Sequence, residues 1–335
     1  MPKANKVRKI LLVSLSNLGD IILTTPVLMR LASEYPDVQI DVITGEPGKE
    51  IFERHPSVRN VMVRRHHRSL SGRVKSVLSV MAEGYDLVID LKNSLLPFFA
   101  ASASSPKPSL SGGKTLLRKK GLSPHKSLVH LSKLAYLGDK VLTERRFFMP
   151  FGDSDLNEAG KYLAKDSGTK NVIIAPGAKS HLKRWPPEYY ARAVDMLTEH
   201  FTCNIIAVGT SGDRAEIRAL ISGTDNRITD LCGRTSLSLL AALLSQADLL
   251  ITNDSAPLHV ASAVDCPVVA IFGPTDEKKY GPLSAAGRTV TSEKACRPCE
   301  KALCAKGITE GCIIDIPPRT VMEAAVDLIR SGESG

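Results

Sequence analysis

The chain has 335 residues, 43% of them hydrophobic and 5% aromatic, and its formal net charge is +9 at pH 7. This length favours two domains, and few aromatic residues suit an α/β protein with aliphatic cores. No run of about 18 uncharged apolar residues occurs, which excludes a predicted membrane span. The apolar stretch 10–13 is too short for a signal peptide and Asp20 follows it, so we expect a cytoplasmic protein.

Apolar runs alternate with helix-length stretches in the first half of the chain. We predict strands at 10–15, 38–43, 60–63 and 85–91, and a helix over 19–35. Strands separated by helices indicate a parallel sheet with right-handed crossovers. Residues 102–125 break this rhythm with Ser, Pro, Gly and Lys, and we expect a long loop there.

A second alternating series begins near residue 171. It predicts strands at 171–175, 205–208, 249–252 and 268–272, and helices at 187–199, 213–222, 236–246 and 257–263. The predicted architecture is α/β, with two Rossmann-like parallel-sheet domains that face a cleft. We assign 1–165 to the first domain, 166–316 to the second and 317–335 to a C-terminal helix. The dinucleotide fingerprint G-x-G-x-x-G is absent from both first turns, which argues against a nicotinamide or flavin enzyme.

The positive charge is concentrated in the first of these domains. Residues 1–165 contain 26 Lys/Arg and 15 Asp/Glu, a net charge of +11, whereas residues 166–335 contain 18 and 20, a net charge of −2. The basic half is expected to attract a large anionic partner, unless it is simply a solvated surface. No recognition-helix motif or aromatic-interleaved basic strand occurs, so nucleic acid is not the expected partner.

Polar residues follow three of the predicted strands. Asp20 comes after the first strand, where it is either a general base or a helix cap. Lys183 lies in the turn after strand 171–175, where it would neutralise a diphosphate, unless this is an ordinary basic loop. Asp254 and Ser255 follow strand 249–252 and would cap the next helix or accept ligand hydroxyls. His259 lies one turn into that helix and either reaches the same site or packs in the core.

Four of the seven cysteines cluster near the C-terminus. Their spacing is C-x2-C-x4-C-x7-C, formed by Cys296, Cys299, Cys304 and Cys312. In a cytosolic chain this favours a structural zinc or iron–sulfur site, with free thiols and then disulfides as the alternatives.

Four segments taken in order make the chain resemble glycosyltransferase family 9, the bacterial heptosyltransferases that build the inner core of lipopolysaccharide. They are NLGDIILTTPVL, PGAKSHLKRWP, DLCGRTSLSLLAALLSQADLLITNDSAPLHVASAV and VVAIFGPT, and the tail CRPCEKALC is similar to tails of many members. The resemblance implies a GT-B fold. Its N-terminal domain would take the acceptor and its C-terminal domain the nucleotide-sugar, usually ADP-heptose.

The resemblance also implies roles for individual residues. Asp20 matches the catalytic base of the family, and Lys183 its phosphate-binding lysine. The donor-binding turn matches Asp254, Ser255, Ala256 and His259, and a ribose-binding acid falls near Asp213. Ala256 replaces the glycine that is usual in this turn, so the reaction type is better determined than the donor.

The expected reaction is an inverting and metal-independent transfer of heptose, with no cofactor required for catalysis, because Lys183 and helix N-termini can stabilise the leaving diphosphate. The expected acceptor is an anionic glycolipid, lipid A with inner-core sugars, at the inner face of the inner membrane, where the protein would be peripheral. The loop residues expected to bind this acceptor are Lys114, Arg118, Lys119 and Lys120. Two alternatives stay open: another nucleotide-sugar used for a different surface glycan, and a non-catalytic nucleotide-sugar-binding relative.

Overall fold

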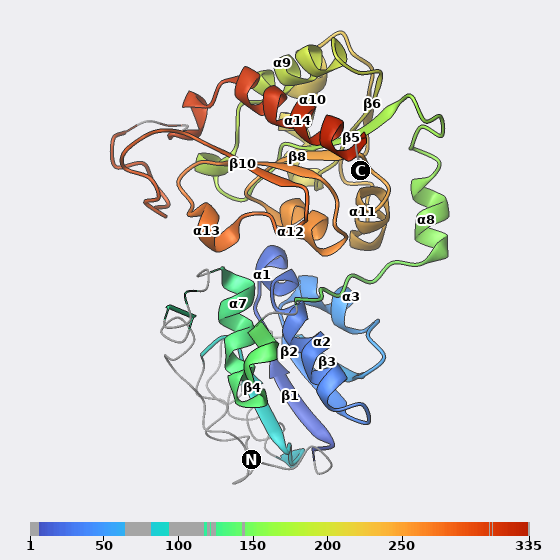
Figure 1. Cartoon of the computed structure of the whole chain (residues 1–335), viewed down its shortest axis with the longest axis vertical. Helices are drawn as coiled ribbons and strands as arrows, with labels where there is room; N and C mark the ends of the chain where they lie inside the picture. Colours follow the sequence, from blue (N-terminus) through green and yellow to red (C-terminus); the bar gives the residue numbers. More distant parts are fainter. Residues whose placement is uncertain are drawn as a thin grey trace. The chain divides into compact units, whose positions relative to one another are not determined.

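The computed structural model describes residues 7–63, 82–93, 117–118, 121, 125–142, 145–307, 309 and 311–333. The chain divides into two compact units, Met1–Pro150 and Phe151–Gly335. Each unit holds one parallel sheet with helices around it (Figure 1). The prediction of two α/β units with parallel sheets is therefore confirmed. Most of the loop 102–125 lies outside the described residues.

The first unit has a four-stranded sheet with the order β3-β2-β1-β4. Its strands are β1 (Lys9–Val13), β2 (Gln39–Thr44), β3 (Val58–Val63) and β4 (Leu87–Asp90). Its helices are α1 (Leu18–Ile22), α2 (Thr25–Glu34), α3 (Lys49–Phe52) and α7 (Lys126–Leu131), followed by the 3-10 helices η3 (Ser132–Leu137) and η4 (Asp139–Leu142). β1 and β4 are buried almost throughout, as expected for central parallel strands.

The single helix predicted over 19–35 is wrong, because the structure forms two helices there. α1 ends at Ile22 and α2 begins at Thr25. The hydroxyl of Thr24 donates to the carbonyl of Ile21 at 2.6 Å, and Pro26 has no N–H to continue the ladder of α1. Helical periodicity does not reveal a break of this kind, since both helices bury the same apolar face.

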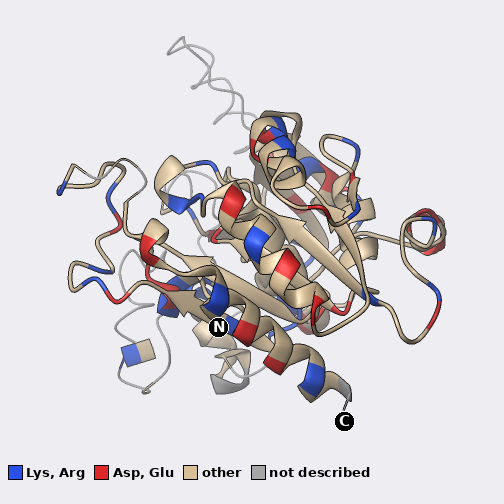
Figure 2. Ribbon diagram, turned by 90° about the horizontal axis from the view of Figure 1, so that it is seen from above, with Lys and Arg blue, Asp and Glu red and all other residues tan. Residues whose placement is uncertain are grey.

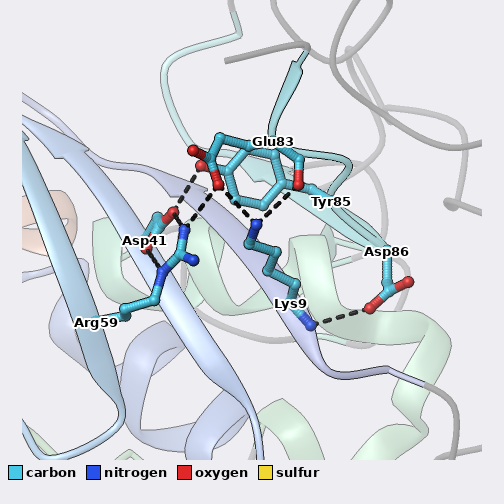
Figure 3. Close-up of polar contacts among 6 residues, drawn as sticks. All are labelled: Lys9, Asp41, Arg59, Glu83, Tyr85 and Asp86. Atoms are coloured by element: carbon cyan, nitrogen blue, oxygen red, sulfur yellow. Dashed lines mark hydrogen bonds and ion pairs between the residues drawn. The ribbon is translucent and has the colours of Figure 1, made fainter. Parts of the chain in front are cut away.

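A polar network joins β1, β2 and β3 to the segment just before β4 (Figure 3). The carboxylate of Asp41 on β2 is 1% exposed, and it accepts bonds from the guanidinium of Arg59 on β3 and from the hydroxyl of Tyr85 at 2.7 Å. Glu83, just before β4, pairs with Arg59 at 3.1 Å and with Lys9 of β1 at 2.6 Å. The buried carboxylate is thus compensated by several donors, which makes this network a structural support of the sheet.

The second unit has a six-stranded sheet with the order β10-β9-β8-β5-β6-β7. Its strands are β5 (Lys170–Ala175), β6 (Cys203–Ala207), β7 (Ile228–Asp230), β8 (Leu249–Asn253), β9 (Val268–Phe272) and β10 (Gly287–Thr291). The four central strands are the predicted ones. The edge strands β7 and β10 were not predicted, because a strand with one neighbour and partial exposure lacks a long apolar run.

Helices and short turns connect these strands. They are α8 (Asp153–Ala159), η5 (His181–Lys183), α9 (Pro187–Thr198), η6 (Ser211–Asp213), α10 (Arg214–Ser222), α11 (Leu237–Leu244), α12 (Ala256–Ala263), α13 (Glu277–Tyr280), η7 (Ile313–Asp315) and α14 (Pro318–Glu333). α8 packs on α11, which places segment 151–165 in the second unit, whereas the sequence-based division lies at 165/166.

The C-terminal helix α14 is amphipathic and packs on α9. Its buried face consists of Val321, Met322, Ala325, Val326, Leu328 and Ile329. Charges of both signs lie along its outer face (Figure 2), and they come from Arg319, Glu323, Asp327 and Arg330. Within the described part of the chain, no helix combines the length and the apolar content needed to cross a membrane.

Candidate active site

Three neighbouring strands of the second unit end at one edge of its sheet. β9, β8 and β5 lie side by side and parallel, so their carboxyl ends meet there. Parallel sheets bind ligands at this edge because loops and helix N-termini converge on it. The structure thus brings the turn that carries Lys183 next to the turn that carries Asp254.

These two residues form an ion pair. Nζ of Lys183 lies 2.6 Å from Oδ2 of Asp254. The Asp254 side chain is 4% exposed and that of Lys183 31%, so a nearly buried carboxylate is neutralised by a partly accessible ammonium group. Such a carboxylate needs this compensation. The pair therefore fixes the position of the Lys183 cation at the edge of the sheet.

The side chain of Asn253 connects the end of β8 to the turn that carries Lys183. This last residue of β8 is completely buried. Its Oδ1 accepts the N–H of Trp185 at 3.1 Å, and its Nδ2 donates to the carbonyl of Pro176 at 2.6 Å. One side chain therefore holds both ends of the segment that carries Lys183. Asn253 has no predicted role of its own, although a polar residue that ends a fully buried strand was the available signal.

The neighbouring cation Arg184 has a different task. Its Nε donates to the carbonyl of Ala178 at 2.7 Å, and its Nη1 pairs with Glu216 at 2.7 Å. Arg184 therefore closes its own turn, whereas Lys183 reaches Asp254. The two cations are adjacent in sequence, but only the structure separates their roles.

The start of α12 lies directly beside Asp254. Ser255 has the extended backbone of an N-cap residue, but its hydroxyl does not cap the helix and lies 3.4 Å from Oγ1 of Thr252. Ala256 is the first helical residue, and His259 is buried one turn further, with 5% exposure. The first-turn amides of α12 have no side-chain cap, which makes this helix start suitable for an anion.

Asp213 lies beside the Lys183 turn as well. Its Oδ2 accepts from the N–H and the hydroxyl of Thr210 at 2.8 and 2.7 Å, so it stabilises its own turn. A Cβ atom on Gly177 would come within 2.3 Å of this carboxylate. The glycine therefore makes room for Asp213 against the main chain of the Lys183 turn.

In the first unit, Asp20 lies in the first turn of α1 and is partly exposed. Its Oδ2 accepts from Nδ2 of Asn17 at 3.2 Å. Among the described residues, it accepts no backbone N–H, so the structure does not use it as a helix cap. Asp20 is thus a partly exposed carboxylate, and its role as a general base stays a prediction.

A buried histidine that the sequence did not indicate lies within electrostatic reach of Asp20. The pKa of His130 on α7 is lowered to about 4, chiefly by burial. The charges of Lys126 and Lys133 contribute to this lowering while that of Asp20 opposes it, so all three act on the ring. Lys133 also donates to Oδ1 of Asn93 after β4 at 2.6 Å. Only the topology brings these residues together.

Of the four loop residues predicted to bind the acceptor, the structure describes one. Arg118 is exposed. Lys114, Lys119 and Lys120 lie outside the described residues.

The four clustered cysteines are all described by the structure. Cys296, Cys299, Cys304 and Cys312 form no disulfide within the described residues, and Cys296 is exposed whereas Cys312 is buried. In the described ranges, no three His, Cys, Asp or Glu side chains lie together in a way that could hold a metal ion. Cys296 and Cys299 nevertheless lie near enough to Cys312 that their charges help to raise the pKa of its thiol, after burial as the larger cause, so the zinc or iron–sulfur site stays a prediction.

The sequence also contains an Asp-x-Asp triplet, Asp153-Ser154-Asp155. It forms the first turn of α8, and Oδ2 of Asp155 accepts the N–H of Gly152 at 3.1 Å. This triplet is thus part of a helix start, where an acidic third residue is a common capping group.

The fold and the site define a two-unit α/β protein with a cation and a helix start at the ligand-binding edge of its second sheet. Residues 73–310 match the family model of glycosyltransferase family 9 (heptosyltransferase). The chain belongs to this family and is a glycosyltransferase.

Individual relatives agree with this assignment. Lipopolysaccharide heptosyltransferase 3 of Escherichia coli K12 is 28% identical over 291 residues, which cover 79% of this chain and 82% of the relative. The solved structure of the E. coli ADP-heptose lps heptosyltransferase II has a TM-score of 0.72 at 22% identity and covers 97% of this chain and 99% of the other. E. coli heptosyltransferase WaaC with ADP has a TM-score of 0.67 at 16% identity, with 96% and 99% covered. These two structural likenesses support the GT-B fold.

Proposed function

We propose that this enzyme transfers heptose from an ADP-heptose-type donor to the inner core of lipopolysaccharide. Its family and its similarity to a lipopolysaccharide heptosyltransferase support the reaction, and the ADP in a related solved structure supports the nucleotide. The observation that carries the proposal is the Lys183–Asp254 pair beside the start of α12.

The donor diphosphate would bind at this pair. Lys183 supplies a cation and the uncapped first turn of α12 supplies N–H donors, and both stabilise negative charge. Asp254, Ser255, Ala256 and His259 would line the donor site. Asp213 would bind a ribose hydroxyl, since its carboxylate lies beside Gly177 in the same group of turns.

Asp20 would act as the general base. As the acceptor oxygen attacks the anomeric carbon, Asp20 takes the proton of the hydroxyl, and the bond from that carbon to the diphosphate oxygen breaks with its electron pair leaving on ADP. Attack from the face opposite the diphosphate inverts the anomeric configuration. The transition state has oxocarbenium character, as in glycoside hydrolysis.

The leaving group needs no metal ion in this proposal. Preorganised charge from Lys183 and the N-terminus of α12 would stabilise the diphosphate as it departs. The Asp153–Asp155 triplet supports this, because its geometry is explained by the cap of α8. No cofactor takes part in catalysis.

The acceptor would meet the first unit, whose segment 1–165 has a net charge of +11 from 26 basic and 15 acidic residues. Long-range attraction favours a glycolipid with several phosphate or carboxylate groups. Arg118, Lys114, Lys119 and Lys120 are the proposed contacts, and the enzyme would act at the inner face of the inner membrane as a peripheral protein.

Replacing Asp20→Asn tests the mechanism. We expect the rate of transfer to fall by about 10²–10⁴-fold, since a general base contributes that much, while ADP binds with unchanged affinity. The exposed Asp37→Asn in the same unit is the matched control and should leave both quantities unchanged. An equal loss of transfer and ADP binding would contradict the base assignment, and a product with retained anomeric configuration would refute inversion.

A thermal-unfolding series with ADP, UDP, GDP and CDP tests the donor. A nucleotide at about 100 times its dissociation constant stabilises the folded state by roughly 2.7 kcal/mol. A shift with ADP alone supports the proposed donor. A shift with another nucleotide favours a different surface glycan, in line with Ala256 at the donor turn, and no shift with any nucleotide favours a non-catalytic relative.

A further inference from the structure

The turn Gly273–Pro274–Thr275 follows β9 at the same sheet edge as Asp254 and Lys183. The N–H of Asp254 donates to the carbonyl of Ile271 near the end of β9 at 3.1 Å. A Cβ atom on Gly273 would lie 2.6 Å from the carbonyl oxygen of Leu182, the residue before Lys183. Only glycine permits this approach, and the turn therefore packs directly on the Lys183 turn.

All three carbonyl groups of this turn are bound by one other segment. Arg297 donates through Nε to Gly273 and through Nη2 to Thr275, the latter at 3.2 Å. The N–H groups of Cys299 and Glu300 donate to Pro274 at 3.1 and 3.0 Å. Segment 297–300 of the cysteine-rich region thus turns the carbonyl groups towards itself.

This arrangement fixes the direction of one N–H group. The Pro274–Thr275 peptide is trans, since the cis bond recorded in the described residues is Arg297–Pro298. In a trans peptide the N–H points opposite to the C=O. The N–H of Thr275 therefore points away from segment 297–300, and it has no acceptor within the described residues.

The side chain of Thr275 adds a second unpaired donor. The residue is 6% exposed, and its buried Oγ1 has no hydrogen-bond partner among the described residues. A buried hydroxyl without a partner destabilises the folded state, so its presence beside a ligand-binding edge indicates a ligand.

Cations lie beside the carboxylates that follow the turn. Oδ2 of Asp276 lies 3.7 Å from Nζ of Lys279, and Glu277 lies 3.3 Å from the guanidinium of Arg297. Both carboxylates next to Thr275 are thus paired, although Lys279 also pairs with Glu300 at 2.7 Å. Lys183 supplies a cation on the neighbouring turn.

We propose that Thr275 is a further donor-binding residue, whose hydroxyl and N–H bind a phosphate oxygen of the nucleoside diphosphate. Arg297 is its positioning residue and holds the turn in the binding orientation. This inference rests on the proposed function, because it assumes that the second unit binds the donor nucleotide.

Titration of ADP into Thr275→Val and Thr275→Ser tests the hydroxyl. Valine keeps the shape but removes the donor, so we expect ADP affinity to fall about tenfold, with serine restoring most of it. Removing an unpartnered hydroxyl should leave the midpoint of thermal unfolding equal or higher. Binding and stability thus respond differently, which a purely structural threonine would not produce.

The wild type separates the two ways of failing. If the wild-type protein does not bind ADP, the proposed donor is wrong. If the wild type binds ADP and Thr275→Val binds it equally well, the Thr275 contact is refuted. A lower unfolding midpoint in Thr275→Val that returns to the wild-type value in Thr275→Ser would also overturn the proposed contact. The hydroxyl would then stabilise the folded turn rather than bind a ligand.

Arg297→Lys tests the positioning role. Lysine keeps the charge beside Glu277 but cannot donate to several carbonyls as a guanidinium does. We expect weaker ADP binding in Arg297→Lys, and no further weakening when it is added to Thr275→Val, because Arg297 acts through Thr275. Arg319→Lys on the exposed face of α14 should bind ADP as the wild type does. Additive losses in the double variant would overturn the positioning role.

Discussion

Asn253 offers a direct test of how the site is held together. Replacing Asn253→Ala removes both hydrogen bonds that this completely buried amide makes, one to the N–H of Trp185 and one to the carbonyl of Pro176. Each buried backbone group left without a partner costs about 1–3 kcal/mol. For two such groups we therefore expect the free energy of unfolding to fall by about 2–6 kcal/mol, which a domain in the upper part of the typical range of about 5–15 kcal/mol would survive.

The same change should weaken donor binding. The segment from Pro176 to Trp185 carries Lys183 and is held at both ends by Asn253. Without this hold, Lys183 is no longer fixed opposite Asp254, and we expect ADP affinity to fall by at least about tenfold, since small displacements of a binding group are costly. Asn253→Asp should behave similarly, because it places an oxygen against the carbonyl of Pro176.

Urea unfolding and ADP titration measure the two effects. The matched control is Asn204→Ala on β6, whose Nδ2 donates to the carbonyl of Tyr162 at 2.8 Å and to Asn171 at 2.9 Å, away from the carboxyl edge. The control should lose stability but keep ADP affinity. Unchanged ADP affinity in Asn253→Ala would refute the reasoning, and so would an equal loss of affinity in Asn204→Ala.

Two further predictions concern charged groups. Lys183→Ala should weaken ADP binding and also lower the free energy of unfolding by about 1–2 kcal/mol, because Asp254 keeps a nearly buried charge while Lys183 is 31% exposed. Adding Asp254→Asn to Lys183→Ala should restore the free energy of unfolding but not the affinity for ADP. Urea unfolding measures the first quantity and ADP titration the second, and a double variant that stays destabilised or regains ADP affinity would contradict the prediction. His130 has a folded-state pKa of about 4, below the ordinary histidine pKa of 6.5, so between these values the unfolded chain binds a proton that the folded chain does not. The free energy of unfolding should therefore decrease as pH falls from 6.5 to 4, by up to about 3 kcal/mol. In His130→Gln this part of the pH dependence should be absent, and an unchanged slope would contradict the buried neutral ring.

The sequence by itself determined the parallel central strands of the second sheet and the turns that follow their carboxyl ends. Apolar strands buried on both faces, such as β8 and β9, give continuous runs of Leu, Ile and Val that stand out in any α/β chain. Parallel strands end at a common edge, so the polar residues that follow them, Lys183 and Asp254, could be assigned to one site before any contact was known.

Only the tertiary structure decided which hydrogen bonds hold that site. Asn253 bridges two turns, Arg297 binds carbonyls more than 20 residues away in sequence, and Thr275 has a buried hydroxyl without a partner. Periodicity reports which face of an element is buried, but it carries no information about the partner of a single donor or acceptor. For the same reason, periodicity did not predict the break at Thr24, which depends on a local hydrogen bond. It did not predict the edge strand β10 either, which pairs with the single neighbouring strand β9.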